Sequence, residues 1–234
     1  RYGLAPNAPI YKMLCDSAFS ALPVEALKDI ELYESSSGNG AFTRIELRFP
    51  SLGESIRQLN NSTTQLIFKL NLTNSFNGSG SIRVSSGAVD LWCANGCTSD
   101  ELSTKAERHT SGFTPEKFEK FIKEQCEKFR TRVEVWQRWA QKEIGTYEAE
   151  QILDSAGMSG RKIKTVMQQF EIEAQQRGSS VWAMYSALTA YSSHDSVSPV
   201  RNSQNVDNVA VTLNTREREV ARLVNSPQFL ELAA

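Results

Sequence analysis

Apolar and polar residues alternate with a period of two in the first hundred residues. The longest run covers residues 42–49 and stops at Pro50. Shorter runs lie at 30–33, 66–72, 82–84 and 89–93, and segments rich in Ser, Asn and Gly separate them at 35–40 and 74–80. Alternation of this kind is typical of strands with one buried face, and the intervening segments suit hairpin turns. The pattern predicts an antiparallel sheet of four to five strands.

After Gly112 the apolar period changes from two to about 3.6. Thr114 and Pro115 form a cap and a first-turn proline, and apolar residues then recur at spacings of three and four as far as Ile144. This predicts one long helix, shorter helices at 147–155 and 160–177, and another that begins at Ser179 or Ser180. A polar loop is expected at 193–210, followed by a closing helix capped near Asn214.

These elements predict an α+β fold. Residues 1–112 form the mainly antiparallel β region and residues 113–234 the helical region, and we expect them to make one continuous domain. The 234 residues are 40% hydrophobic and 23% charged, which is typical of globular proteins. No apolar run is long enough to cross a membrane. The sparse cysteines, Cys15, Cys93, Cys97 and Cys126, favour a reducing, cytoplasmic location.

Basic residues are concentrated in one segment although the total charge nearly cancels. The chain has 26 Lys and Arg against 27 Asp and Glu, a net charge of −1, which excludes a bulk polycation. Residues 105–142 nevertheless contain ten Lys and Arg against six Glu, a balance of +4. Several pairs at i, i+4 explain part of this charge as ordinary solvated helix faces, and that interpretation stays open.

The other interpretation is a nucleic-acid-binding surface to which strand and helix cations both contribute. Phosphates would contact the basic side chains, and an aromatic ring would stack on a base. Arg161, Lys162 and Lys164 would add to the surface if the fold brings them near. The expected binding residues are Arg44, Arg48, Lys69, Arg83, Trp92, Lys105, Arg108, Lys117, Lys120 and Lys128.

Two kinds of site are weaker alternatives. Cys93, Cys97 and His109 are zinc-type ligands, but three residues separate the cysteines and no second cysteine pair follows. We therefore expect no metal, no cofactor and no catalytic residue, and a metal-dependent hydrolase is a minor hypothesis. The two helices at 147–177 also match a helix-turn-helix regulator, a pattern common in helical proteins that do not bind DNA.

Four stretches in order resemble a known family: residues 74–78, 93–96, 108–110 and 182–191, the last closing on His194. Together they are similar to the phage/plasmid-like protein family catalogued as domain of unknown function 932. Members typically carry His-Asp-Gly where this chain has Phe76, Asn77 and Gly78, so chemistry that requires this imidazole is not expected. The resemblance implies a setting in phages and plasmids, beside replication and recombination functions, and implies no reaction.

The sequence therefore favours a non-enzymatic protein that binds single-stranded nucleic acid and anneals or protects it. By analogy with phage annealing proteins, which form rings around a basic groove, we expect a homo-oligomer. The expected location is the host cytoplasm, with no membrane contact. The alternative is a host-takeover or anti-defence protein that acts through contacts with a host protein.

Overall fold

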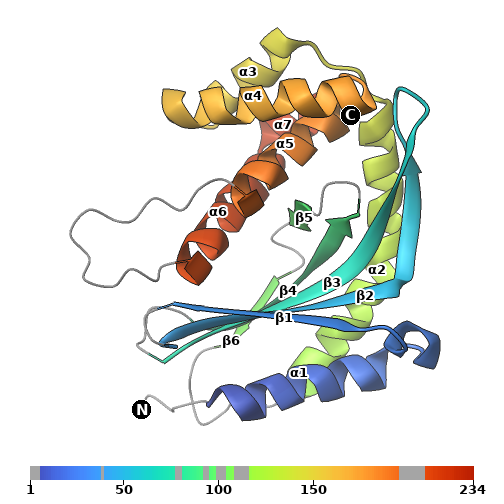
Figure 1. Cartoon of the computed structure of the whole chain (residues 1–234), viewed down its shortest axis with the longest axis vertical. Helices are drawn as coiled ribbons and strands as arrows, with labels where there is room; N and C mark the ends of the chain where they lie inside the picture. Colours follow the sequence, from blue (N-terminus) through green and yellow to red (C-terminus); the bar gives the residue numbers. More distant parts are fainter. Residues whose placement is uncertain are drawn as a thin grey trace.

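A six-stranded antiparallel sheet forms the centre of the molecule in the computed structural model, which describes residues 6–37, 40–76, 81–91, 95–98, 104–107, 116–194 and 209–234 (Figure 1). The strand order is β1-β2-β3-β4, and two four-residue strands pair with opposite halves of β4. This confirms the α+β fold and the antiparallel pairing. The strands are β1 (Glu31–Ser37), β2 (Phe42–Arg57), β3 (Thr63–Ser75), β4 (Ile82–Asp90), β5 (Asn95–Thr98) and β6 (Thr104–Glu107).

Strand β2 does not end at Pro50, as the sequence had predicted, but continues to Arg57. Phe49 pairs with Phe68 and the next paired residue is Gly53, which faces Ile67. Proline has no backbone N–H to donate, and this irregularity removes residues 50–52 from the ladder, so none is required there. Residues 82–84 and 89–90 likewise belong to one strand rather than two, because β4 also pairs with β3 through the intervening residues 85–88.

Helices make up most of the rest of the described chain. The predicted long helix and the three helices after it are confirmed, but α6 begins at Val209, five residues before the expected cap at Asn214. The loop predicted at 193–210 is therefore too long at both ends, because α5 continues to His194, and residues 195–208 lie outside the described residues. The sequence analysis missed α1 and α7. The helices are α1 (Asn7–Ala21), the short 3₁₀ helix η1 (Val24–Leu27), α2 (Glu116–Gln141), α3 (Thr146–Ser155), α4 (Gly160–Arg177), α5 (Val181–His194), α6 (Val209–Val224) and α7 (Pro227–Ala233).

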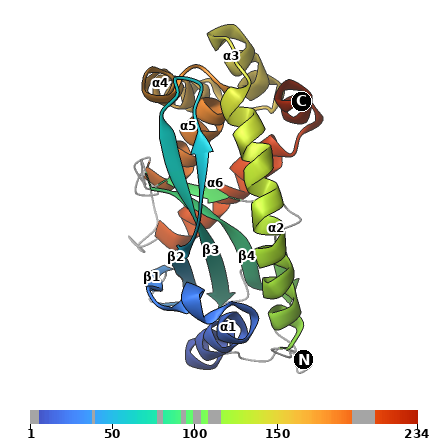
Figure 2. The same ribbon diagram turned by 90° about the vertical axis from the view of Figure 1, so that its right-hand side faces the viewer.

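Helices α1 and α2 cover the apolar face of the sheet and contact each other, with α1 crossing near the lower part of α2 (Figure 2). The Phe68 ring of β3 meets Phe129 of α2 edge-on at 5.3 Å between centroids, and Ser86 Oγ of β4 donates a hydrogen bond to Gln125 Oε1 of α2. On the other face, α6 lies against β1 and β2. The sheet therefore separates an apolar layer from a layer in which charged strand residues meet α6.

A buried ion pair of Arg177 joins the C-terminal helices to the sheet. Arg177 of α4 lies 2.7 Å from Asp90 Oδ2 of β4 and 2.7 Å from Glu173 Oε2, and all three side chains are at most 2% exposed. The chain then turns into α5 at Gly178, which packs directly on Leu59 of the β2–β3 connection. None of the described helices is long and apolar enough to span a membrane.

Candidate nucleic-acid interface

Alternation along β2 and β3 sends a polar stripe toward α6. Arg44, Glu46 and Arg48 are separated by two positions each, so they share one face of β2. The register places Asn71 directly opposite Glu46 and Lys69 opposite Arg48 on the same face. The sequence analysis predicted that Arg44, Arg48 and Lys69 contribute to one binding surface, and the pairing of β2 with β3 does bring these three cations together.

Two carboxylates lie among these cations, and the five residues Arg44, Glu46, Arg48, Lys69 and Glu217 are called here the buried charge cluster. Arg44 Nη2 donates to Glu217 Oε1 at 2.7 Å and to Glu46 Oε2 at 3.1 Å. Arg48 Nε donates to the other Glu46 oxygen at 2.6 Å, and Lys69 Nζ lies 3.3 Å from Glu46 Oε2. The cations therefore already bind carboxylates, one of which comes from α6.

Burial and charge act in opposite directions on this cluster. Burial alone raises the pKa of Glu46, but Lys69, Arg44 and Arg48 outweigh it and lower that pKa to about 2. Burial likewise acts to lower the pKa of Arg44, whereas Glu217 and Glu46 raise it above the ordinary value. Glu46 and Arg44 thus stay ionised near neutral pH, and the ion pair between Arg44 and Glu217 attaches α6 to the sheet. A cavity of about 200 Å³ lies beside it.

A second, larger cavity of about 680 Å³ lies where β4, β6, α4 and α6 meet. Its lining contains four basic residues and one acidic residue, Glu219. We call this cavity the basic groove, and its four basic residues are Arg83, Lys162, Arg218 and Arg222.

Helix α6 brings its groove residues to one face through the spacing of the sequence. Thr215, Arg218, Glu219 and Arg222 follow the i, i+3, i+4, i+7 pattern, so they line one side of the helix. Arg218 and Arg222 are exposed, and neither forms an ion pair with a residue that the structure describes. These two guanidinium groups are therefore accessible to an anionic ligand.

The acidic residue of the groove has partners of its own. Lys162 Nζ lies 2.6 and 2.8 Å from the two Glu219 oxygens, and Tyr191 Oη donates to Glu219 Oε2 at 3.4 Å. Burial acts to lower the pKa of Lys162, but these neighbours raise it overall. Arg216 stacks on the Tyr191 ring with 5.3 Å between the guanidinium carbon and the centroid. Glu219 thus fixes α6 against α4 and α5.

The other expected binding residues lie elsewhere or outside the described residues. Lys105 pairs with Val84, so it lies on the α2 face of the sheet, opposite to its strand neighbour Arg83. Lys120 is exposed on α2, 3.9 Å from Glu124, and Lys128 lines a different cavity. Trp92 and Arg108, and the side chain of Lys117, lie outside the described residues. The described cations therefore occupy several places rather than one.

The sequence analysis missed Arg218 and Arg222, although it named Lys162 as an additional cation. The available signal was their i, i+4 spacing on the polar side of an amphipathic helix, which most solvated helices also show. The position of Arg83 on β4, at a cavity that α6 also lines, has no such signal.

The structure identifies no reactive thiol among the side chains it describes. Burial raises the pKa of Cys126 to about 12 and also raises that of Cys15, so both thiols stay protonated at neutral pH. Both are free cysteines. The minor zinc hypothesis involves Cys93, Cys97 and His109, whose side chains lie outside the described residues.

The geometry is that of an α+β protein with a basic groove between its sheet and its penultimate helix. The chain belongs to the family described as Domain of unknown function (DUF932), whose model matches residues 34–221. The match begins in β1 and ends in α6, so it includes every basic-groove residue except Arg222. Neither a search of curated proteins nor a search of solved structures finds a match.

Proposed function

We propose that this protein is a non-enzymatic, single-stranded nucleic-acid-binding protein that contacts phosphates through the basic groove. One observation carries the proposal: four basic residues line one cavity with a single carboxylate, in a chain whose net charge is −1. Folding thus concentrates positive charge that the composition does not show. A positively charged groove that follows the backbone is a recurrent feature of proteins that bind single strands without sequence preference.

The roles of the four groove cations differ. Arg218 and Arg222 lie about one helical turn apart and supply the exposed phosphate contacts. Arginine binds phosphate oxygens with two parallel hydrogen bonds, so each contact is directional as well as charged. Lys162 is held by Glu219, and it contributes charge at the wall of the groove rather than a primary contact.

The cluster cations have an indirect role in this proposal. Arg44, Arg48 and Lys69 bind carboxylates in the buried charge cluster, so they position α6 instead of holding phosphates. Because Arg218 follows Glu217 directly, the bond that fixes Glu217 also fixes the groove. The same proposal includes a wider setting. A phage or plasmid encodes the protein, which acts in the host cytoplasm as a homo-oligomer that anneals or protects DNA.

Fluorescence anisotropy with a labelled oligothymidylate tests the proposal. We expect binding at low salt, with an affinity that falls steeply as salt rises, since each neutralised phosphate of a single strand contributes a slope of about −0.7. Absence of binding at low salt would overturn the proposal. If one host protein then co-purifies in stoichiometric amount, the alternative of a host-takeover protein is selected instead.

A further inference from the structure

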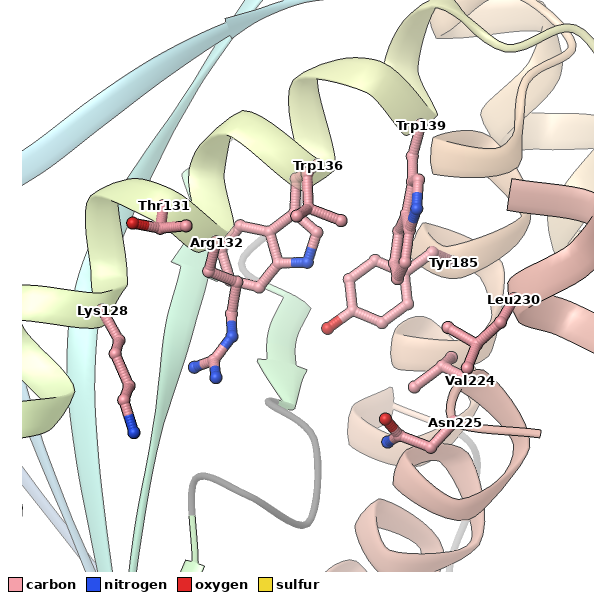
Figure 3. Close-up of a pocket in the computed structure, with 10 residues that line it drawn as sticks. Lys128, Thr131, Arg132, Trp136, Trp139, Tyr185, Val224, Asn225 and Leu230 are labelled. Carbon is pink, nitrogen blue, oxygen red and sulfur yellow. The ribbon is translucent and has the colours of Figure 1, made fainter. Parts of the chain in front are cut away.

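A cavity of about 320 Å³ lies between α2, α5 and the junction of α6 with α7, and we call it the aromatic pocket (Figure 3). We propose that the aromatic pocket binds a nucleoside monophosphate, either free or at the end of a nucleic-acid strand. None of its lining residues belongs to the basic groove, so this inference stands independently of the proposed function. Its volume is within the range of about 300–1,000 Å³ that is usual for small-molecule sites.

One face of α2 supplies both an apolar and a cationic part of the pocket. Lys128, Arg132, Trp136 and Trp139 are spaced by four, four and three residues, so they follow one side of the helix. Figure 3 shows the Lys128 and Arg132 side chains pointing from α2 toward the side where Asn225 lies. The cations thus occupy one end of the stripe and the indole rings the other.

The aromatic end is rigid because its rings pack on one another. Tyr185 lies 5.4 Å from Trp139 in an edge-on contact and 6.3 Å from Trp136 in a stacked one, measured between centroids. Trp136 and Tyr185 are only 2% and 1% exposed, and Val224 and Leu230 supply apolar surface across the cavity. Fixed aromatic and aliphatic walls of this kind suit a flat aromatic ring.

Polar groups meet this apolar site at two points. The Asn225 amide Nδ2 donates to the backbone oxygen of Ala221 at 2.6 Å, which directs its carbonyl oxygen to other donors, such as the exocyclic amino group of a base. Lys128 and Arg132 complement a phosphate group, and Lys128 pairs with no carboxylate of the described chain. A ring with an amino group and an attached phosphate matches all three features.

Quenching of tryptophan fluorescence by adenosine monophosphate tests the proposal on the full chain. We expect saturable quenching, with weaker binding of adenosine and no quenching by inorganic phosphate. The double variant Lys128→Gln/Arg132→Gln should weaken binding of the nucleotide by about tenfold or more and change adenosine binding little, since the proposal assigns both cations to the phosphate. Lys123→Gln, an exposed cation elsewhere on α2, is the matched control and should bind as the wild type.

Two arms distinguish the source of the nucleotide. If a 5′-phosphorylated oligonucleotide competes with the monophosphate, and still competes in the Arg218→Gln/Arg222→Gln variant, the pocket binds the end of a strand. If the oligonucleotide does not compete, the pocket binds a free nucleotide. The proposal is overturned if the monophosphate does not quench at millimolar concentration. It is also overturned if Lys128→Gln/Arg132→Gln, shown to be folded by circular dichroism, binds the nucleotide like the wild type.

Discussion

Arg44 Nη2 lies 2.7 Å from Glu217 Oε1, and the two residues are 173 positions apart in the sequence. This ion pair joins β2 to α6, the helix that lies against β1 and β2 on the polar face of the sheet. Arg218 and Arg222 follow Glu217 on the same helix, so the exposed part of the basic groove depends on a buried ion pair. We therefore expect the stability of the cluster and the proposed binding at the groove to be coupled.

Replacing Glu217 with alanine tests the structural half of this coupling. Removal of Glu217 leaves Arg44, Arg48 and Lys69 sharing Glu46, and breaking a buried ion pair by removing one partner costs about 3 kcal/mol or more. Urea denaturation should show a decrease in unfolding free energy of that size. Glu150→Ala, at an exposed position of α3, should change it by less than about 0.5 kcal/mol. Equal effects of the two substitutions would contradict the role given to Glu217.

Acid should weaken the fold through Glu46. Its pKa is about 2 in the folded protein against an ordinary 4.5, so its contribution to stability is present above pH 4.5. The contribution is lost as the pH falls from 4.5 through 2, and the shift corresponds to about 3 kcal/mol. Unfolding free energies measured across this range should fall less steeply for Glu46→Gln than for the wild type. Glu150→Gln should retain the wild-type slope, and parallel slopes for all three proteins would exclude this source of acid sensitivity.

Gly178 is required where α4 turns into α5. Its φ is +91°, and a Cβ there would lie 2.8 Å from the Leu59 Cβ. Gly178→Ala should therefore lower the unfolding free energy by about 3 kcal/mol, from backbone strain together with the steric clash. Gly160→Ala is the matched control, because a Cβ there meets nothing within 4 Å and alanine favours the helix. Thermal unfolding would refute the account if the two variants had the same midpoint.

The Cys126 thiol should resist alkylation in the folded protein. Burial raises its pKa to about 12, so the reactive thiolate is scarce at pH 8. Peptide mapping after brief treatment with iodoacetamide should recover the Cys126 peptide unlabelled, and urea should make it fully reactive. Rapid labelling without urea would show that this helix face is open.

The sequence predicts the parts of the fold that a local period determines. The alternation at 42–49 and the 3.6 period after Gly112 correspond to β2 and α2, and the helices of the C-terminal half follow the same rule. Helix α1 also has a usable signal, since Ile10, Leu14 and Ala18 are buried at a spacing of four. The segments after α1 alternate in polarity, which favours strands, and a prediction of strands and turns for all of the first hundred residues omits this helix.

The site is less predictable because its residues come together only through tertiary packing. The face shared by Arg44, Arg48 and Lys69 follows from strand alternation, but Glu217 reaches them from a distant helix. Arg83 and Lys105 are close to opposite each other in the ladder, yet one position of register sends them to different faces of the sheet. Single-residue register and helix placement are long-range properties, so counting charges along the chain does not determine which of them share a surface.

The salt dependence of binding to an oligothymidylate, compared between wild type and two double variants of equal charge change, tests the central claim most directly. Arg218→Gln/Arg222→Gln removes both exposed groove cations, whereas Arg138→Gln/Lys142→Gln removes two exposed cations at the end of α2. The account predicts that the groove variant binds more weakly and loses about 1.4 from the slope of log affinity against log salt, with the α2 variant close to wild type. Identical slopes for the two variants would contradict it.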